Sequence, residues 1–334
     1  MLIKRLPVET KIDFMSVRMI AFALSAVAIL ASIFLIPTKG LNLGIDFAGG
    51  TLVEISEPTG AEIEDIRSAL EDLPLKDLQV TTATGTGTDA QGIFVIRAAS
   101  SDLTEAEELA AEADADLTLV AAADQVVAKL QEVFPQGPDD AKDWEVLRKE
   151  NVGPKVSGEL LQKGVLALVV ALVFMLCYIW FRFEWQFSIG AVLALAHDVI
   201  LTIGVFSLLS IDFNLTTIAA LLTIIGYSMN DTVVVYDRVR EELRRYKKMS
   251  IKDVINLSLN RTLTRTTLTS GTTLLALISI YVLGGEVLRG FSFALIWGVV
   301  VGTYSSIFVA SALLLHTGLT RERKTVESAE ERFS

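Results

Sequence analysis

The sequence predicts a polytopic α-helical membrane protein with six transmembrane helices and one extracytoplasmic α+β domain of the ferredoxin-like βαββαβ type. Three observations lead to this prediction. Apolar residues make up 51% of the chain and its mean hydropathy is +0.50, more than a soluble globular protein needs. The apolar residues are concentrated in six blocks, each near the ~20 residues that cross a bilayer. Between the first two blocks, a stretch of about 120 residues has the shorter periods of strands and amphipathic helices.

The first apolar block, residues 19–36, is expected to be an uncleaved transmembrane helix. A secretory signal is the alternative, because Lys4, Arg5, Lys11 and Arg18 precede the block. The block is long for a signal, however, and Phe-Leu-Ile-Pro at its end is not a small-residue cleavage site. The five further spans are expected at Gly164–Phe181, 185–211, 213–236, 266–285 and 290–315. The chain is therefore expected to begin with a cytoplasmic N-terminus over 1–18 and, after the first span, to form an outside domain over 37–158. A five-helix bundle follows over 159–318, with a cytoplasmic loop at about 237–265 between the fourth and fifth spans. The last region is a cytoplasmic tail over 319–334.

The distribution of charge predicts the orientation. The N-terminus, the loop between the fourth and fifth spans and the tail are rich in Lys and Arg, and six spans place all three on one side. The positive-inside rule makes that side cytoplasmic. The segment 37–158 then lies outside, and it holds 24 acidic and 9 basic residues. The whole-chain net charge of −11 therefore comes from this domain and disfavours nucleic-acid binding.

The outside domain is predicted to contain two strand–helix–strand units. Strands are expected at 51–56, 77–84, 92–97 and 144–152, with helices at about 62–70 and 104–134. This order is that of a split βαβ fold. The domain contains no histidine, cysteine or nucleotide-binding loop, so we expect no catalytic site in it. The single cysteine of the chain, Cys177, excludes an internal disulfide, and no zinc site is expected.

Ionisable residues inside the spans are the candidate functional residues, because each costs roughly 2.5–3.5 kcal/mol to insert. Asp231 lies in the fourth span and Arg265 opens the fifth at a similar depth, so an ion pair between them is possible. A carboxylate whose proton affinity changes when its cationic partner moves can act as a proton carrier. The alternative is a structural pair near the headgroups, with Arg265 snorkelling. Asp198 in the third span is a further proton-relay candidate, and its neighbour His197 is expected to be a structural donor. Supporting polar residues are Ser228, Asn230, Thr269, Thr272 and Thr273.

The glycine-rich segment 44–50 is expected to be a turn between the first span and the first strand. It lacks the Gly-Lys-Ser/Thr ending of a phosphate-binding loop and follows a membrane helix rather than a strand. Asp46, Gly49 and Gly50 are therefore candidates for a junction or hinge. Farther along, the apolar face of residues 251–263 predicts an amphipathic helix on the membrane surface.

Several motifs resemble the SecD/SecF family of protein-export membrane proteins. They are Leu-Asn-Leu-Gly-Ile-Asp-Phe-Ala-Gly-Gly-Thr at 41–51, Gly-Tyr-Ser-Met-Asn-Asp-Thr-Val-Val-Val-Tyr-Asp-Arg at 226–238, and Thr-Leu-Thr-Arg-Thr-Thr-Leu-Thr-Ser-Gly-Thr-Thr at 262–273. The resemblance extends over nearly the whole chain beyond about residue 10 and implies the RND superfamily. Six spans with one modest outside domain resemble the SecF branch of the family rather than SecD or the fused form.

The resemblance implies a role in late protein export that is driven by the proton-motive force. It implies a SecD partner with the other six spans, association with the SecYEG channel and often with YajC and YidC, and an unfolded polypeptide as the substrate. It also implies a location in the bacterial inner membrane and no enzymatic activity. The coupling ion would be the proton, with no other cofactor, and Asp231 and Arg265 would take part in proton coupling. The alternatives are an RND-type exporter of small molecules or lipids and a structural scaffold without proton coupling.

Overall fold

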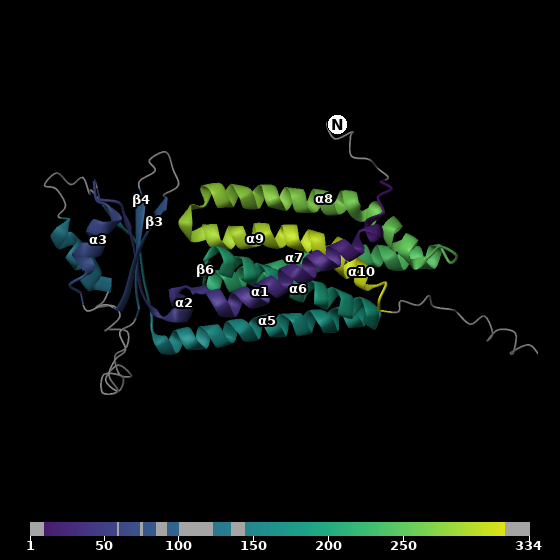
Figure 1. Cartoon of the computed structure of the whole chain (residues 1–334), viewed down its shortest axis with the longest axis horizontal. Helices are drawn as coiled ribbons and strands as arrows, with labels where there is room; N and C mark the ends of the chain where they lie inside the picture. Colours follow the sequence, from purple (N-terminus) through teal and green to yellow (C-terminus); the bar gives the residue numbers. More distant parts are fainter. Residues whose placement is uncertain are drawn as a thin grey trace, which may run out of the picture.

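The protein is a helical bundle with a small α+β domain at one end (Figure 1). The computed structural model describes residues 10–58, 60–73, 76–84, 92–99, 123–134 and 144–317. Six helices are long and apolar enough to cross a membrane, which confirms the predicted number of spans. Their bounds are α1 Arg18–Lys39, α5 Pro154–Arg182, α6 Trp185–Leu209, α7 Leu215–Arg245, α8 Ile251–Leu283 and α9 Gly285–Ser305, the last continued by the π-helix η2 Ser306–Ala310 and by α10 Ser311–Leu313.

Helices α6, α7 and α9 form the centre of the bundle. In the most apolar 18-residue stretch of each of these helices, 56% of the residues are buried. The corresponding share in α1, α5 and α8 is 11–17%. Helix α1 packs on α6, α5 packs on α6 and α7, and α8 packs on α7 and α9. The outer three helices therefore present most of their apolar side chains to the surroundings of the bundle, as helices in contact with lipid or with a membrane partner do.

The segment 237–265, expected as the cytoplasmic connection between the fourth and fifth spans, is mostly helical. Helix α7 continues to Arg245 and α8 begins at Ile251, so only residues 246–250 connect them without helix. Ser250 caps α8, because its hydroxyl accepts the backbone N–H of Asp253 (3.1 Å). The charged end of α7 and the charged start of α8 continue as helix beyond the apolar stretches, since neither contains a glycine or a proline.

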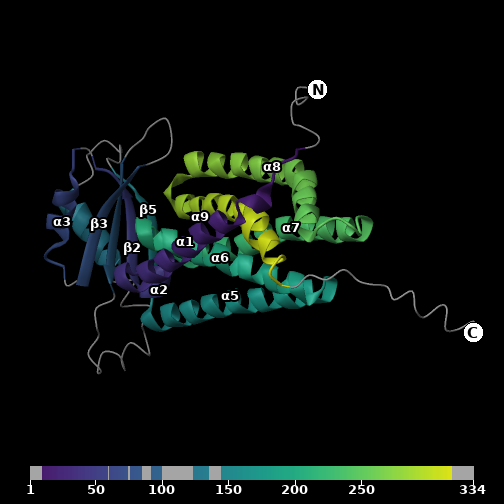
Figure 2. The same cartoon turned by 45° about the vertical axis from the view of Figure 1, so that its right-hand side comes forward.

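The apolar face of the first half of α8 is covered by protein. Its Ile255 and Leu259 belong to the same hydrophobic cluster as Phe14 and Met15 of η1, Phe14–Ser16. Asn260 accepts a hydrogen bond from the Ile12 amide and donates one to the Ile12 carbonyl (both 2.8 Å). The expected membrane-surface helix is thus the first half of α8, continuous with the fifth span, and its apolar face packs against the segment before α1. Figure 2 shows how this half of α8 turns toward the end of α7.

The domain outside the bundle has the predicted ferredoxin-like topology. Its elements are β2 Gly50–Ser56, α3 Ile63–Leu70, β3 Lys76–Thr84, β4 Gly92–Ala99, a helix over 123–133, and β5 Val146–Val152. The strand order is β3-β4-β2-β5, and every neighbouring pair is antiparallel. The core lies between one face of the sheet and the two helices, where Val53, Ile55, Ile66, Leu70, Val126 and Leu130 pack. The first part of the helix expected over 104–134 and the tail 319–334 lie outside the described residues.

Candidate functional site

Asp231 is buried at the contact of three helices. Its exposed fraction is 7%, and it lies on α7 opposite α8 and the start of η2. The hydroxyl of Thr266 on α8 donates to Oδ1 (2.5 Å), and the hydroxyl of Ser306 donates to Oδ2. A carboxyl group inside an apolar bundle with hydroxyl partners on both oxygens can exist with or without a proton, because hydroxyl hydrogens rotate to suit either state.

Arg265 is not the partner of Asp231 in this structure. Its side chain is exposed, and no ion pair joins it to Asp231 among the described residues. Successive side chains on a helix are about 100° apart in direction. Since Thr266 points to Asp231, Arg265 points away from it. Arg265 is adjacent to Thr266 and so lies at a similar level of the bundle to Asp231, but no ion pair joins the two among the described residues.

Asp198 is a fully enclosed carboxylate of the bundle, with an exposed fraction of 0%. Oδ1 is 2.9 Å from Nδ1 of His197. Oδ2 accepts hydrogen bonds from Ser228 of α7 (2.6 Å) and Ser305 of α9 (2.8 Å). The two aspartates therefore occupy neighbouring levels of the bundle, because Ser228 and Asp231 are three residues apart on α7, a rise of about 4.5 Å.

His197 links this carboxylate to α1. Its exposed fraction is 3%, and Nε2 is 3.2 Å from the Ser25 hydroxyl. Ser25 is 3.0 Å from the Tyr304 hydroxyl, which in turn donates to the backbone carbonyl of Ala21 (2.9 Å). The imidazole and the Tyr304 ring are stacked, with centroids 6.2 Å apart. A chain of polar contacts thus runs from Asp198 and His197 on α6 to Ser25 on α1, then to Tyr304 on α9, and from Tyr304 back to the backbone of α1.

The π-helix η2 begins at the residue that contacts Asp231. The wider turn leaves backbone carbonyls without their usual i+4 partners, and side chains take these positions. Ser311 donates to the Ser306 carbonyl (2.7 Å), and the buried Tyr236 donates to the Ala310 carbonyl (3.0 Å). Single π-turns inside α-helices are frequent at functional sites.

The other predicted polar residues divide into two groups. Ser228 is buried, but it contacts Asp198 rather than Asp231. Asn230, Thr269 and Thr272 are exposed, and the two threonines donate to carbonyls of their own helix, while Thr273 is half-buried. The residues that sequence reasoning missed are Ser25, Thr266, Tyr304, Ser305 and Ser306. Ser305 and Ser306 lie in a stretch of small residues, a composition typical of close helix packing rather than of a site.

The junction between domain and bundle is built around the glycine-rich segment. β1 (Asn42–Leu43) pairs in parallel with β6 (Asp212–Phe213), and α2 (Ile45–Ala48) follows β1. Asp46 accepts the amide hydrogen of Leu215 (2.8 Å), so it caps the start of α7. Gly49 and Gly50 have φ angles of 74° and 115°, which side chains disfavour. These residues fix where the chain leaves the bundle and enters β2.

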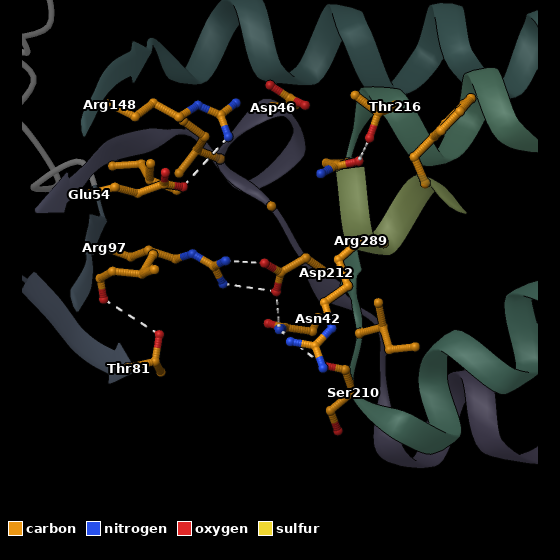
Figure 3. A pocket seen from close by; sticks show the side chains of 18 of the residues that line it. Asn42, Asp46, Glu54, Thr81, Arg97, Arg148, Ser210, Asp212, Thr216 and Arg289 are labelled. Atoms are coloured by element: carbon orange, nitrogen blue, oxygen red, sulfur yellow. Dashed lines mark hydrogen bonds and ion pairs between the residues drawn. The ribbon is translucent and has the colours of Figure 1, made fainter. Parts of the chain in front are cut away.

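A cavity of about 500 Å³ separates the open face of the sheet from the bundle. Figure 3 shows that Arg97 of β4 reaches across it to Asp212, with Nη1 2.9 Å from Oδ1 and a second contact through Nη2. Asn42 donates to the same Oδ1 (2.6 Å). On the sheet, Arg148 pairs with Glu54 (3.6 Å). The Arg97–Asp212 pair therefore connects the domain directly to the bundle.

Comparisons with known proteins agree with this architecture. The family profile described as protein export membrane protein SecD/SecF, C-terminal, matches residues 136–320, and that of the SecD/SecF GG motif matches 34–56. Protein translocase subunit SecF of Rhodobacter capsulatus is 42% identical over 333 residues, which are 99% of this chain and 96% of the relative. SecF of Vibrio alginolyticus is 41% identical over 317 residues, 95% of this chain and 93% of the relative.

Longer proteins match as well. SecDF of Brucella abortus is 40% identical over 318 residues, which cover 95% of this chain and 38% of the relative. The crystal structure of SecDF from Thermus thermophilus superposes with a TM-score of 0.75 at 34% identity and covers 93% of this chain. The matched part is 39% of that SecDF chain.

Proposed function

Because the chain belongs to the SecD/SecF family of protein-export membrane proteins, we propose that it is the SecF-type subunit of the Sec export machinery. In this role it uses the proton-motive force to assist the late translocation of unfolded polypeptides across the bacterial inner membrane. The N- and C-termini and the basic ends of α7 and α8 face the cytoplasm, and the α+β domain faces the periplasm. The coupling ion is the proton, and the protein does not act as an enzyme.

The observation that carries this proposal is the environment of Asp231. The carboxyl group is buried in a membrane bundle without a cationic partner among the described residues. When it is ionised, Thr266 and Ser306 both donate to it. When it is protonated, it donates to Ser306, whose hydroxyl also lies 3.1 Å from the Thr303 carbonyl and can donate there. The site thus accepts and releases a proton by rotation of hydroxyl groups, and each proton that crosses 100 mV supplies about 2.3 kcal/mol.

A companion half is the second part of the proposal. Arg265, Thr269 and Thr272 form an exposed polar stripe on α8, inside a helix that is otherwise apolar enough to span the membrane. A guanidinium facing lipid costs several kcal/mol, so this stripe favours a protein partner. Fused SecDF relatives support SecD as that partner. SecYEG, with YajC and YidC, completes the proposed assembly, and Arg265 acts in coupling once the companion is bound.

The test is proton-driven export into vesicles that contain the subunit with its SecD companion and the channel. The Asp231→Asn variant is isosteric and keeps both hydroxyl contacts, so it is expected to assemble normally and to lose the stimulation of export by an imposed pH gradient. Asn230→Asp/Asp231→Asn is the matched control, because it restores the charge one residue away on an exposed face. Full stimulation in Asp231→Asn refutes proton coupling and leaves the scaffold alternative. Normal export with loss of drug or lipid efflux favours the exporter.

A further inference from the structure

The His197–Asp198 pair is a buried titratable cluster that lies apart from Asp231. Three of the helices packed on α6 contribute polar groups to it. Helix α1 contributes Ser25, α7 contributes Ser228, and α9 contributes Ser305 and Tyr304. The carboxylate of Asp231 lies about one turn along α7 from Ser228. Among the described residues, no lysine or arginine forms an ion pair with Asp198. Within the described part of the chain, only His197 can therefore supply a positive charge to this carboxylate.

The hydrogen bonds around Ser25 locate one proton on His197. The Tyr304 hydroxyl has a single hydrogen, and it donates that hydrogen to the Ala21 carbonyl. In the contact between Ser25 and Tyr304, the donor is then Ser25. Ser25 also has a single hydrogen, so it accepts in its contact with His197. The Nε2 atom of His197 is consequently the donor and carries a proton.

The contact on the other side of the ring requires a second proton. Nδ1 lies 2.9 Å from Oδ1 of Asp198, a hydrogen-bond distance that needs one hydrogen between the two atoms. With Nε2 already protonated, this hydrogen makes the pair neutral overall. Asp198 also accepts two hydroxyl donors on Oδ2, an arrangement that stabilises an ionised carboxylate. The hydrogen therefore resides on Nδ1, and the pair is an imidazolium with a carboxylate.

We infer that His197 and Asp198 form a second proton-binding site of the bundle, which holds one dissociable proton between them and transmits its loss to helix α1. When the proton leaves Nε2, that atom becomes an acceptor and Ser25 must donate to it. Tyr304 must then donate to Ser25, and the Ala21 carbonyl loses its hydroxyl donor. One proton thus reverses two hydrogen bonds that hold α1 against α6 and α9. This inference rests on the proposed function for the use of the proton, but not for its presence.

The test reads the protonation of His197 directly. The chain has two histidines, so His316→Gln leaves His197 as the only imidazole. The variant, in complex with its companion half in lipid bilayers, is labelled with ¹⁵N-histidine and studied by solid-state NMR at pH 7.5. We expect both ring nitrogens to be protonated and the Nε2 proton to be lost as the pH is raised. A neutral ring with its proton on Nδ1 at pH 7.5 overturns the inference.

A functional comparison separates this inference from the proposed function. His197→Gln keeps a side-chain donor and acceptor but cannot bind a proton. Tyr304→Phe keeps the ring beside His197 and removes the hydroxyl that links Ser25 to the Ala21 carbonyl. We expect proton-driven export by the unmodified protein to depend on pH, and we expect both variants to lose this dependence. Profiles that superimpose on the unmodified one refute the link to α1. If export does not respond to protons at all, the proposed function fails, while the NMR result still decides the charge of His197.

Discussion

Ser305 and Ser306 are consecutive residues whose hydroxyl groups donate to different buried carboxylates. Ser305 donates to Asp198, and Ser306 donates to Asp231. The π-helix begins at the second of them. A shift of this short segment therefore changes the hydrogen bonding of both carboxylates together. The two sites are linked through the backbone of α9 and η2, although the described residues show no hydrogen bond between the two carboxylates.

Removal of the Ser306 hydroxyl is expected to impair proton exchange at Asp231. Hydrogen bonds to charged groups contribute about 1.5–3 kcal/mol, so Ser306→Ala should slow proton-driven export about tenfold or more while assembly is retained. The measurement is the initial rate of export into vesicles with an imposed pH gradient. Ser292→Ala is the matched control, since Ser292 is also buried on α9 but donates only to carbonyls of its own helix. Equal rates in the two variants would contradict a role for Ser306.

The contact between α1 and α6 depends on Gly204. A Cβ atom at this position would overlap the side chain of Ser32, so Gly204→Ala should push the two helices apart. Overpacking of this kind costs about 1–3 kcal/mol, measured as the free energy of unfolding in detergent or bilayers. Gly226→Ala is the control, because nothing lies within 4 Å of a Cβ atom there and alanine favours helix. If both variants lose the same free energy of unfolding, the loss in Gly204→Ala does not come from the close approach of α1 and α6.

The Arg97–Asp212 pair is expected to hold the outside domain on the bundle. Its side chains are 20% and 38% exposed, so solvent screens the pair and its coupling energy should be near the upper end of roughly 0.2–1 kcal/mol. A double-mutant cycle with Arg97→Ala and Asp212→Ala measures this energy. Hydrogen exchange at the Gly44 amide, which bonds to the Phe213 carbonyl (2.9 Å), reports the effect on the junction. The swapped pair Arg97→Asp/Asp212→Arg should restore part of the protection, and no recovery would argue against an electrostatic contact.

The segment before α1 should loosen from α8 in acid. Asn256 donates to the Asp13 carboxylate (2.7 Å), which holds the pKa of Asp13 below its ordinary value, and Lys252 adds to this effect. Because the pKa is lowered in the folded state, the stabilisation is present above the ordinary Asp range, near 3.9, and is lost as the pH falls through the folded value. Asn256 also accepts the Met15 amide (3.0 Å).

Hydrogen exchange at the Met15 amide tests this prediction. In the unmodified protein, its protection should fall severalfold as the solution is acidified through that range. In Asp13→Asn, protection should be lower throughout and should lack this pH dependence when the two proteins are compared at the same pH. A parallel loss of protection in both would assign the change to another group.

Much of the fold could be predicted because it depends on local patterns. A run of about twenty apolar residues identifies a span wherever it packs, and alternation identifies β2 and β4 before their partners are known. The connection expected over 237–265 is mostly helical, because polar residues past the apolar stretches continue both helices. The apolar stripe at 251–263 indicated a membrane surface, whereas the structure covers it with residues 10–16, a contact across some 240 positions that no local pattern encodes.

The sequence by itself determined the number of spans and the order of strands and helices along the domain, since hydropathy and the period of apolar residues are properties of the chain alone. Only the tertiary structure decided which side chains meet. The position of Arg265 along the sequence predicted a contact with Asp231. In the structure, Thr266 makes that contact, because its side chain rather than that of Arg265 points toward α7. The packing of α1 and α9 on α6 likewise joined His197 to Ser25 and Tyr304, because the direction of a side chain around its helix is set by the neighbours that bury it.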